Sequence, residues 1–262
     1  MDLQLKDKVA IIGGASQGIG MGIARMLAAE GAKVVITARR EPALQEAATR
    51  IRAETGAEVL AIPSDVRKSE DCERVADTTL ATYGRIDILV NNDGAPPIGK
   101  LEDFDDIAWQ KAVEQNLYSV IRMVRKCVPH MRAGGYGRII NVTSVSTRQP
   151  IAGLGLSVAT WAGVIAYAKT LSLELGPAGI TVNTILPGRV DTGRLELVTR
   201  RRAEQEGRDA DKMIAELLHE VPVGRLGTPE DVAAMVALLV SPRGGFITGT
   251  AIQVDGGLQR AT

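Results

Sequence analysis

Short apolar runs alternate with longer amphipathic stretches along nearly the whole chain. The short runs are rich in valine and isoleucine and predict seven β-strands, at residues 9–13, 33–38, 59–62, 86–91, 138–143, 181–186 and 251–254. Between them, helical periodicity predicts helices at residues 19–30, 42–54, 69–83, 106–132, 157–175 and 229–240. Strands that alternate with helices in this way indicate parallel strands joined by right-handed crossovers.

Some of these strands are apolar on both faces, as in Val34-Val35-Ile36, which indicates a sheet covered by helices on each side. We therefore expect an α/β fold, a doubly wound Rossmann-type parallel sheet with helices on both faces. A length of 262 residues fits one domain over residues 1–262. Residues 192–220 form a highly charged stretch, which is most simply interpreted as a solvent-exposed helical segment. Its position late in the chain also suits a lid over a site.

Composition then excludes several classes of partner. The 31 acidic and 31 basic residues balance, so neither nucleic acid nor an anionic membrane surface is expected as a partner. The N-terminal residues lack the apolar core of a signal peptide, and no window approaches the roughly eighteen uninterrupted apolar residues of a membrane span. Cys72 and Cys127 stand far apart in no ligand-like spacing, so we expect no metal site and a reducing, cytoplasmic location.

The first candidate site is a glycine cluster between the first strand and the first helix. Gly14-Ala15-Ser16-Gln17-Gly18-Ile19-Gly20 has glycines where the backbone must turn tightly and approach a pyrophosphate, whose charge is favoured at a helix N-terminus. A tight turn alone could also explain such a cluster. Its position after a strand and before a helix favours dinucleotide binding.

The spacing of these glycines resembles the motif of short-chain dehydrogenases/reductases, and later motifs extend the resemblance over nearly the whole chain. Asn91-Asn92-Asp93-Gly94 resembles the family's Asn-Asn-Ala-Gly, and Val254-Asp255-Gly256-Gly257 resembles its C-terminal strand and turn. The resemblance implies a nicotinamide cofactor and a small-molecule substrate. The cofactor-binding residues that it implies are Gly14, Ser16, Gln17, Gly18, Ile19, Gly20, Asp65, Val66, Asn91, Gly94, Pro187, Gly188, Val190 and Thr192. Because the family is commonly tetrameric or dimeric, we also expect a homo-tetramer or homodimer.

The end of the second strand favours NADP over NAD. An NAD enzyme would place an acidic residue near Ala38 to hold the ribose 2′-hydroxyl, and none is there. Arg39 could instead contact a 2′-phosphate through charge-assisted hydrogen bonds. The alternative is that Arg39 and Arg40 are only surface charges at the start of a helix.

The reaction centre departs from the family pattern. In the family a serine positions the carbonyl, a tyrosine donates the proton, a lysine binds the nicotinamide ribose, and an asparagine supports a water relay. Ser144 matches the serine and Asn116 the asparagine, whereas the tyrosine and lysine positions fall on Ser157 and Trp161. The following Ala162-Gly163-Val164 fits the family helix without a gap, so the resemblance implies a divergent member without the catalytic Tyr and Lys.

No other residue replaces that pair convincingly. Tyr167 lies in the same predicted helix, but roughly 80° from the face of Ser157, and the other tyrosines are Tyr83, in a distant loop, Tyr118 and Tyr136. Asp93 could be an acid or base, although a hydrogen-bonded loop carboxylate is the simpler interpretation.

Three arginines, Arg148, Arg189 and Arg194, lie on segments that should border the pocket, and either an anionic substrate or plain surface placement would explain them. The two histidines are weaker candidates for a role in the site. His219 in the lid is most simply an exposed residue, and His130 is most simply a structural one.

Two hypotheses follow. The first is an NADP-dependent oxidoreductase acting on a carbonyl or hydroxyl small molecule through Asn116, Ser144 and Ser157. The second keeps the cofactor fold without hydride transfer, as an NADP-binding sensor or a non-redox lyase or hydrolase.

Overall fold

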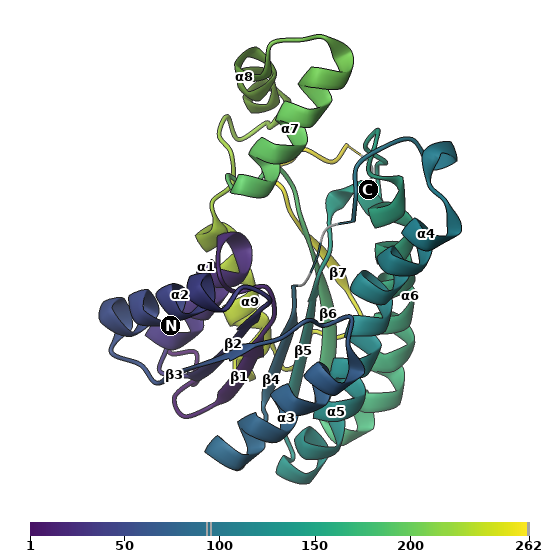
Figure 1. Cartoon of the computed structure of the whole chain (residues 1–262). Coiled ribbons are helices and arrows are strands. Elements are labelled where there is room, and N and C mark those ends of the chain that lie inside the picture. The colour runs from purple at the N-terminus through teal and green to yellow at the C-terminus, as the bar shows by residue number, and fades with distance from the viewer. Residues whose placement is uncertain (93, 95, 261–262) are drawn as a thin grey trace.

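The computed structural model describes residues 1–260 except 93 and 95. Its centre is a seven-stranded parallel sheet in the order β3-β2-β1-β4-β5-β6-β7 (Figure 1). The strands are β1 (Val9–Ile12), β2 (Lys33–Ala38), β3 (Val59–Pro63), β4 (Ile88–Asn91), β5 (Gly137–Val142), β6 (Ile180–Pro187) and β7 (Ala251–Val254). The order reverses between β1 and β4, and this reversal confirms the doubly wound fold predicted from the sequence.

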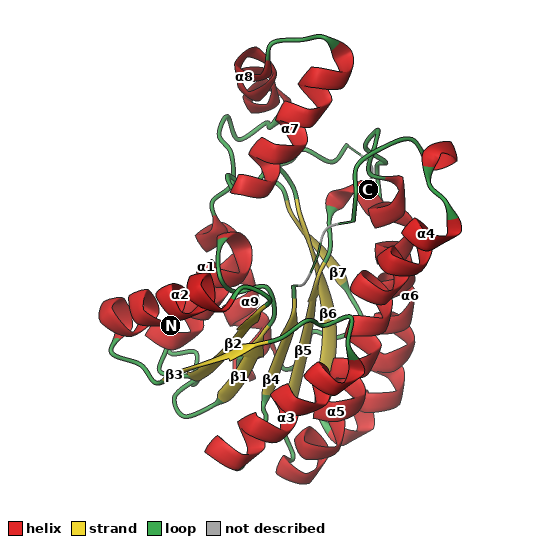
Figure 2. Cartoon of the chain, viewed as in Figure 1, coloured by secondary structure: helices red, strands yellow, loops and turns green. Residues whose placement is uncertain are grey.

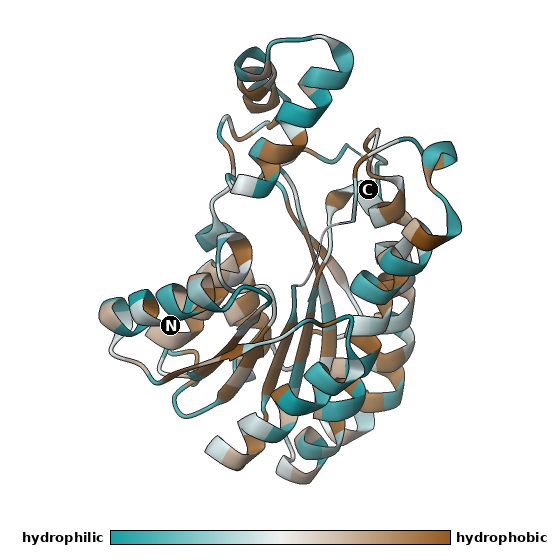
Figure 3. Ribbon diagram, in the orientation of Figure 1, coloured by the Kyte–Doolittle hydropathy of each residue, from teal (hydrophilic) through white to brown (hydrophobic). Residues whose placement is uncertain are grey.

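Helices cover both faces of the sheet (Figure 2). One face carries α1 (Gly18–Ala29), α2 (Glu41–Thr55) and α9 (Pro229–Val240), and the other carries α3 (Ser69–Tyr83), α5 (Ser119–Gly134) and α6 (Gly155–Leu175). Along β1, Ala10 and Ile12 point into the first core whereas Val9 and Ile11 point into the second. Figure 3 shows the apolar strands enclosed between these two helical layers.

The remaining elements lie outside the two layers. They are α4 (Asp106–Val113), α7 (Gly193–Glu206), α8 (Ala210–Glu220) and short 3₁₀ turns at Leu101–Asp103, Val145–Thr147, Gly176–Ala178 and Pro242–Gly244. The segment expected as a lid therefore forms two helices, which lie beyond the carboxyl ends of the strands (Figure 1). Thr192 begins α7 as its N-cap, accepting a hydrogen bond from the Leu195 amide.

One predicted helix, residues 106–132, is wrong as a single element. It is interrupted by a π-helical turn, Glu114–Tyr118, which separates α4 from α5. Within this turn the Asn116 side chain is buried and its Nδ2 donates to Thr160 Oγ1 at 2.8 Å. Such turns occur frequently at functional sites, and hydrophobic periodicity does not reveal them because each adds one residue to one helical turn.

The segment Gly155–Ala178, which contains α6, is long and apolar enough to cross a membrane by length and composition, with a mean hydropathy of 1.2. In the fold it covers the sheet, and Val164, Leu171 and Leu175 pack into the second core. Core helices of folded domains pass the same test of length and composition, so this property has a structural explanation here.

Contact between α1 and α9 depends on a glycine. A Cβ at Gly22 would lie 2.6 Å from the Pro229 Cβ and 3.1 Å from its backbone carbon. Gly22→Ala should therefore push the two helices apart and lower the free energy of unfolding by roughly 1–3 kcal/mol, measured by urea denaturation. Gly134→Ala is the control because nothing lies within 4 Å of its added Cβ, so an equally stable Gly22→Ala protein would contradict the tight contact.

Candidate active site

A cavity of about 750 Å³ opens at the carboxyl edge of the sheet. Its wall is formed by the segments that follow β1, β2, β3, β5 and β6, by the start of α6, and by the first turns of α7. In doubly wound sheets, ligands bind at this edge, where the strand order reverses.

The turn between β1 and α1 forms one end of the cavity. Gly14, Ser16, Gln17, Gly18 and Ile19 all lie on the wall, as expected from the sequence. The N-cap side chain of α1 makes no capping hydrogen bond, and the first turn of α1 holds no acidic residue. The first N–H groups of α1 therefore suit an anion such as a pyrophosphate.

Gly20 was expected to bind the cofactor but does not line the cavity. It lies behind the turn, where an added Cβ would come within 2.5 Å of the Gly14 carbonyl oxygen and 2.6 Å of Asn92 Nδ2. Asn92 Nδ2 in turn donates to the Gly13 carbonyl oxygen at 3.2 Å. Gly20 thus lets α1 close against the turn, and its role is to shape the cradle.

The far end of the cavity, beyond β2 and β3, is rich in arginine. Arg39 and Arg40 lie on the wall together with Asp65, Val66 and Arg67. The only carboxylate among these residues belongs to Asp65, and Arg67 Nε binds it at 2.8 Å. This hydrogen bond is the main reason why the pKa of Asp65 is lowered.

This end fits the 2′-phosphate of NADP. Arg39 is exposed and forms no salt bridge within the described part of the chain. The Ser64 hydroxyl is buried on the wall and has no hydrogen-bond partner among the described residues. The sequence analysis missed Ser64 and Arg67, although both lie at the carboxyl edge of the sheet, next to the predicted Asp65 and Val66.

Ser144 and Ser157 both lie on the cavity wall, as predicted. Ser144 follows β5, and its Oγ accepts a hydrogen bond from the Ser146 amide at 3.1 Å. Ser157 is 1% exposed, and its Oγ has no partner among the described residues. A buried hydroxyl on a cavity wall with no protein partner can bind a polar ligand atom.

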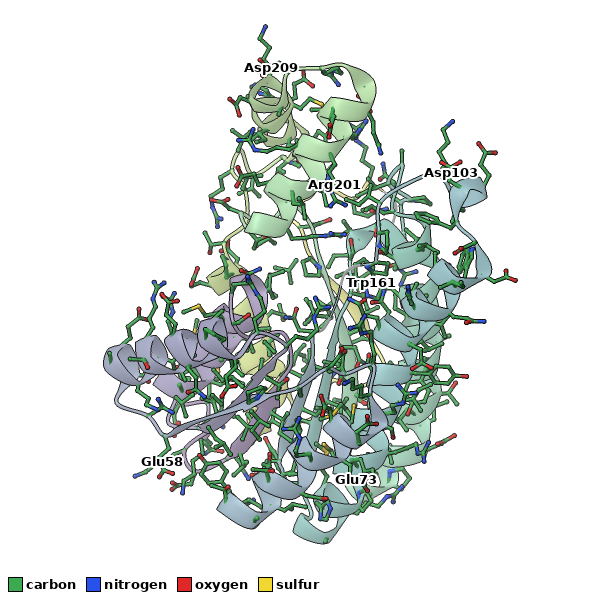
Figure 4. All side chains as sticks on the ribbon, in the orientation of Figure 1. Glu58, Glu73, Asp103, Trp161, Arg201 and Asp209 are labelled. Carbon is green, nitrogen blue, oxygen red and sulfur yellow. The ribbon has the colours of Figure 1, made fainter. Side chains whose placement is uncertain are left out.

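Trp161 lies one turn of α6 beyond Ser157 and also lines the cavity. Figure 4 shows Trp161 between the sheet edge and α7. An indole has no titratable proton at neutral pH, so this side chain contributes shape and an N–H donor.

Asn91 and Asn116 do not line the cavity. They border a small void of about 10 Å³, and Val142, Thr143 and Trp161 line both this void and the cavity. Asn91 Nδ2 donates to Asn141 Oδ1 at 2.9 Å, whereas Asn116 Oδ1 and Asn141 Nδ2 lack partners among the described residues. The predicted catalytic asparagine therefore lies next to the cavity but not on its wall.

Loops near β4 and β6 complete the wall. The predicted Gly94, Pro187, Gly188, Val190 and Thr192 all line the cavity. Asp93 lies outside the described residues. Additional wall residues that the sequence did not identify are Gln115, Ile151, Leu154, Leu195, Val198 and Leu258, which only the packing of distant segments brings together.

Two of the three arginines expected at the pocket are there. Arg189 and Arg194 line the cavity, whereas Arg148 is exposed and does not. Arg189 forms a 2.9 Å ion pair with Glu220 of α8. Burial, and to a lesser extent the charge of Arg201, lowers the pKa of Arg194.

None of the described tyrosine side chains reaches the cavity wall. Tyr83 is the last residue of α3, so placing it in a loop was wrong. Tyr136 donates to the Val240 carbonyl oxygen at 2.6 Å, and burial raises its pKa to about 12. Tyr118 is 46% exposed, and Tyr167 packs against the second core, as its angle from Ser157 predicted.

The ionisable wall residues of the described chain are five arginines and Asp65. They include no histidine, lysine, tyrosine or cysteine, and both histidines are exposed. No group of three potential metal-ligating side chains occurs among the described residues. This wall can bind phosphates and orient a carbonyl, but it offers no group that ordinarily titrates near neutral pH.

The cradle generates a prediction. Gly20→Ala should weaken NADPH binding at least tenfold, because α1 must move away from the turn to accommodate the Cβ, and cofactor fluorescence measures this. The control is Gly163→Ala in α6, where the added Cβ makes ordinary contact, 3.5 Å from Leu117 Cδ2. Unchanged NADPH affinity in a folded Gly20→Ala protein would contradict the role of Gly20.

The chain is similar over residues 14–259 to the family described as enoyl-(acyl carrier protein) reductase. Among curated proteins it is 37% identical to the short-chain reductase protein NovJ of Streptomyces niveus, over 96% of this chain and 94% of that protein. Both comparisons extend over nearly the whole domain, including the cradle and α6.

Solved structures of reductases also resemble this chain over its whole fold. L-sorbose reductase from Gluconobacter frateurii, in complex with NADPH and L-sorbose, superposes with a TM-score of 0.94 at 33% identity, covering 100% of both chains. A variant of actinorhodin polyketide ketoreductase with NADPH gives a TM-score of 0.93 at 34% identity, over 97% of this chain and 98% of that one. The fold, the glycine cradle and these relatives lead to one conclusion: the chain belongs to the short-chain dehydrogenase/reductase family.

Proposed function

We propose that the protein is an NADP-dependent oxidoreductase acting on a carbonyl or hydroxyl group of a small molecule. The observation that carries this proposal is the continuity of the cavity wall, from the cradle and Arg39 to the hydroxyls of Ser144 and Ser157. Both structural relatives described above contain NADPH, and the wall offers the corresponding arginine-rich end.

The residues divide into two roles in this proposal. Gly14, Gly18 and Thr192 hold the pyrophosphate region, and Arg39 binds the 2′-phosphate. NADPH, when bound, supplies the hydride. Ser144 and Ser157 donate hydrogen bonds to the carbonyl oxygen, whose negative charge grows during reduction and needs such donors.

The proton then has to come from water held by the serines. We propose that Ser157 and Trp161 occupy the positions of the family's tyrosine and lysine, so the ordinary acid and its cationic helper are both missing. A serine hydroxyl can relay a proton between water and the substrate oxygen, but alone it is a weak acid. This makes slow turnover or a reactive carbonyl substrate the expected behaviour.

A separate observation favours a second function, NADP binding without hydride transfer. Since no group on the described wall ordinarily titrates near neutral pH, the protein could bind NADP without hydride transfer and act as a sensor. Lyase or hydrolase chemistry in the same cavity belongs to this alternative.

The main test measures NADPH oxidation against a panel of aldehydes and ketones. We expect turnover of at least one carbonyl, and a roughly 100-fold loss of kcat/KM in Ser157→Ala with NADPH affinity unchanged, the effect expected of losing one oxyanion donor. Ser172→Ala, a buried serine further along α6, is the control. Cofactor binding without turnover of any carbonyl would favour the sensor.

The double variant Ser157→Tyr with Trp161→Lys separates the two functions further. Reductase activity gained by this variant would indicate that the cavity keeps competent hydride geometry, and the activity should then depend on the tyrosine. No gain from a folded variant that still binds NADPH would argue that the cavity has lost that geometry.

Cofactor preference has a separate test. Arg39→Ala should weaken NADPH binding roughly 10- to 100-fold through loss of charge-assisted hydrogen bonds, while NADH binding stays within about twofold. Arg50→Ala, an exposed arginine of α2 paired with Glu54, is the control. An equal loss for both cofactors would contradict NADP selection by Arg39.

We also propose that α7 and α8 act as a lid, since Arg194, Leu195 and Val198 of α7 line the cavity and α8 packs against α7. A cytoplasmic homo-tetramer or homodimer is the proposed form of the protein. Exposed apolar side chains at Leu173 of α6 and at Phe246 and Ile247 before β7 support association between copies of the chain.

A further inference from the structure

The arginines of α7 differ in whether they have counter-ions. Arg200 and Arg202 each pair with a glutamate four residues away in sequence: Arg200 Nε lies 2.9 Å from Glu196 and Arg202 Nε 2.7 Å from Glu206. Neither paired arginine lines the cavity. Their carboxylate partners account for two of its four arginine charges.

The other two, Arg194 and Arg201, form no salt bridge with any residue that the structure describes. Seven residues apart, they share one face of α7 with Val198, and Arg194 and Val198 line the cavity. Arg201 lies on the same helix above the level of Trp161 (Figure 4). Arg201 is exposed and does not line the cavity, so Arg194 is the α7 arginine that brings positive charge without a described counter-ion to the wall.

Arg194 is held in a setting that disfavours its charge. It is half-buried, and both burial and the nearby Arg201 lower its pKa. A buried charge is costly unless it is paired, so an anion next to Arg194 would relieve both effects.

The position of Arg194 points to the substrate end of the cavity. Its Nη2 donates to the Pro96 carbonyl oxygen at 3.3 Å. A few residues further, the Gly99 amide donates to the Gly153 carbonyl oxygen at 3.0 Å, so this loop lies against the start of α6, where Ser157 is. The 2′-phosphate end, at Arg39, lies beyond the opposite part of the sheet.

Apolar side chains also line this end of the wall. Ile151 and Leu154 line it from the segment before α6, Leu195 and Val198 from α7, and Leu258 from the C-terminal segment. A ligand that matches both features has an apolar body and one negative group.

We infer that the substrate is an amphipathic carbonyl compound whose anionic group, a carboxylate or a phosphate, binds Arg194. This substrate class deepens the proposed oxidoreductase function and rests on it for turnover. Anion binding at Arg194 can nevertheless be measured without turnover.

Three probes separate charge from shape: 4-acetylbenzoate, its neutral methyl ester, and 4-acetylphenyl phosphate. Calorimetry on the full chain with NADPH should show both anions binding roughly 10- to 100-fold more tightly than the ester, as expected for a charge-assisted hydrogen bond. The tighter of the two anions identifies the carboxylate or the phosphate as the preferred group. In Arg194→Met this preference should disappear, with NADPH affinity unchanged.

Arg202→Ala is the matched control, because it removes an arginine of the same helix that already has a carboxylate partner. It should leave the preference for the anionic probes intact. Where turnover occurs, the same ranking should appear in kcat/KM. Preferential anion binding without turnover would support the anion site at Arg194 and count against the oxidoreductase.

Three results would overturn the inference. One is that the unmodified protein binds 4-acetylbenzoate, 4-acetylphenyl phosphate and the neutral methyl ester with equal affinity. A second is an Arg194→Met protein that loses NADPH affinity but keeps the preference, which would assign Arg194 to the cofactor. The third is an Arg194→Met protein that keeps both its NADPH affinity and the preference, because the anion would then bind elsewhere.

Discussion

The close approach of α1 to the turn after β1 is the contact on which the site depends. Gly20 has no side chain, so the helix can pack against the Gly14 carbonyl group and the Asn92 amide. This approach directs the first N–H groups of α1 into the cavity, where no capping side chain or acidic residue competes for them. Helix-terminal N–H groups and the helix dipole together favour a phosphate at this place. The same helix end borders Thr192, the residue that begins α7.

The two ends of the cavity differ in the functional groups that the chain provides for binding and for chemistry. The cofactor end has glycines, free amides and unpaired arginine charge, which fits an anionic dinucleotide. The reaction end has two serine hydroxyls and an indole, where hydride transfer would ordinarily need a titratable acid. Asn116 does not line the cavity but borders the small void beside it, whereas Ser157 lies on the cavity wall.

Charge is distributed unevenly around this cavity although the chain as a whole has no net charge. Five arginines line the wall, and the single carboxylate among the described wall residues is tied to Arg67. The two paired arginines of α7, which do not line the cavity, are neutralised by glutamates within the same helix. The chain therefore has a positively charged cavity although its net charge is zero, because the compensating carboxylates lie elsewhere on the surface.

The sequence by itself determined the α/β class, the seven strands and the cradle, since these depend on local periodicity and on glycines at a strand–helix junction. The resemblance to the family also predicted Ser144 and Ser157 as site residues, and both line the cavity. Only the tertiary structure decided that Gly20 supports the cradle from behind, that Asn116 does not line the cavity, and that a π-helical turn interrupts the helix at Asn116. Likewise, only the folded chain shows that Arg194 lines the cavity without a described counter-ion. The pairs of Arg200 and Arg202 follow from their i,i+4 spacing within α7, whereas the surroundings of Arg194 depend on segments distant in sequence, which one-dimensional patterns do not bring together.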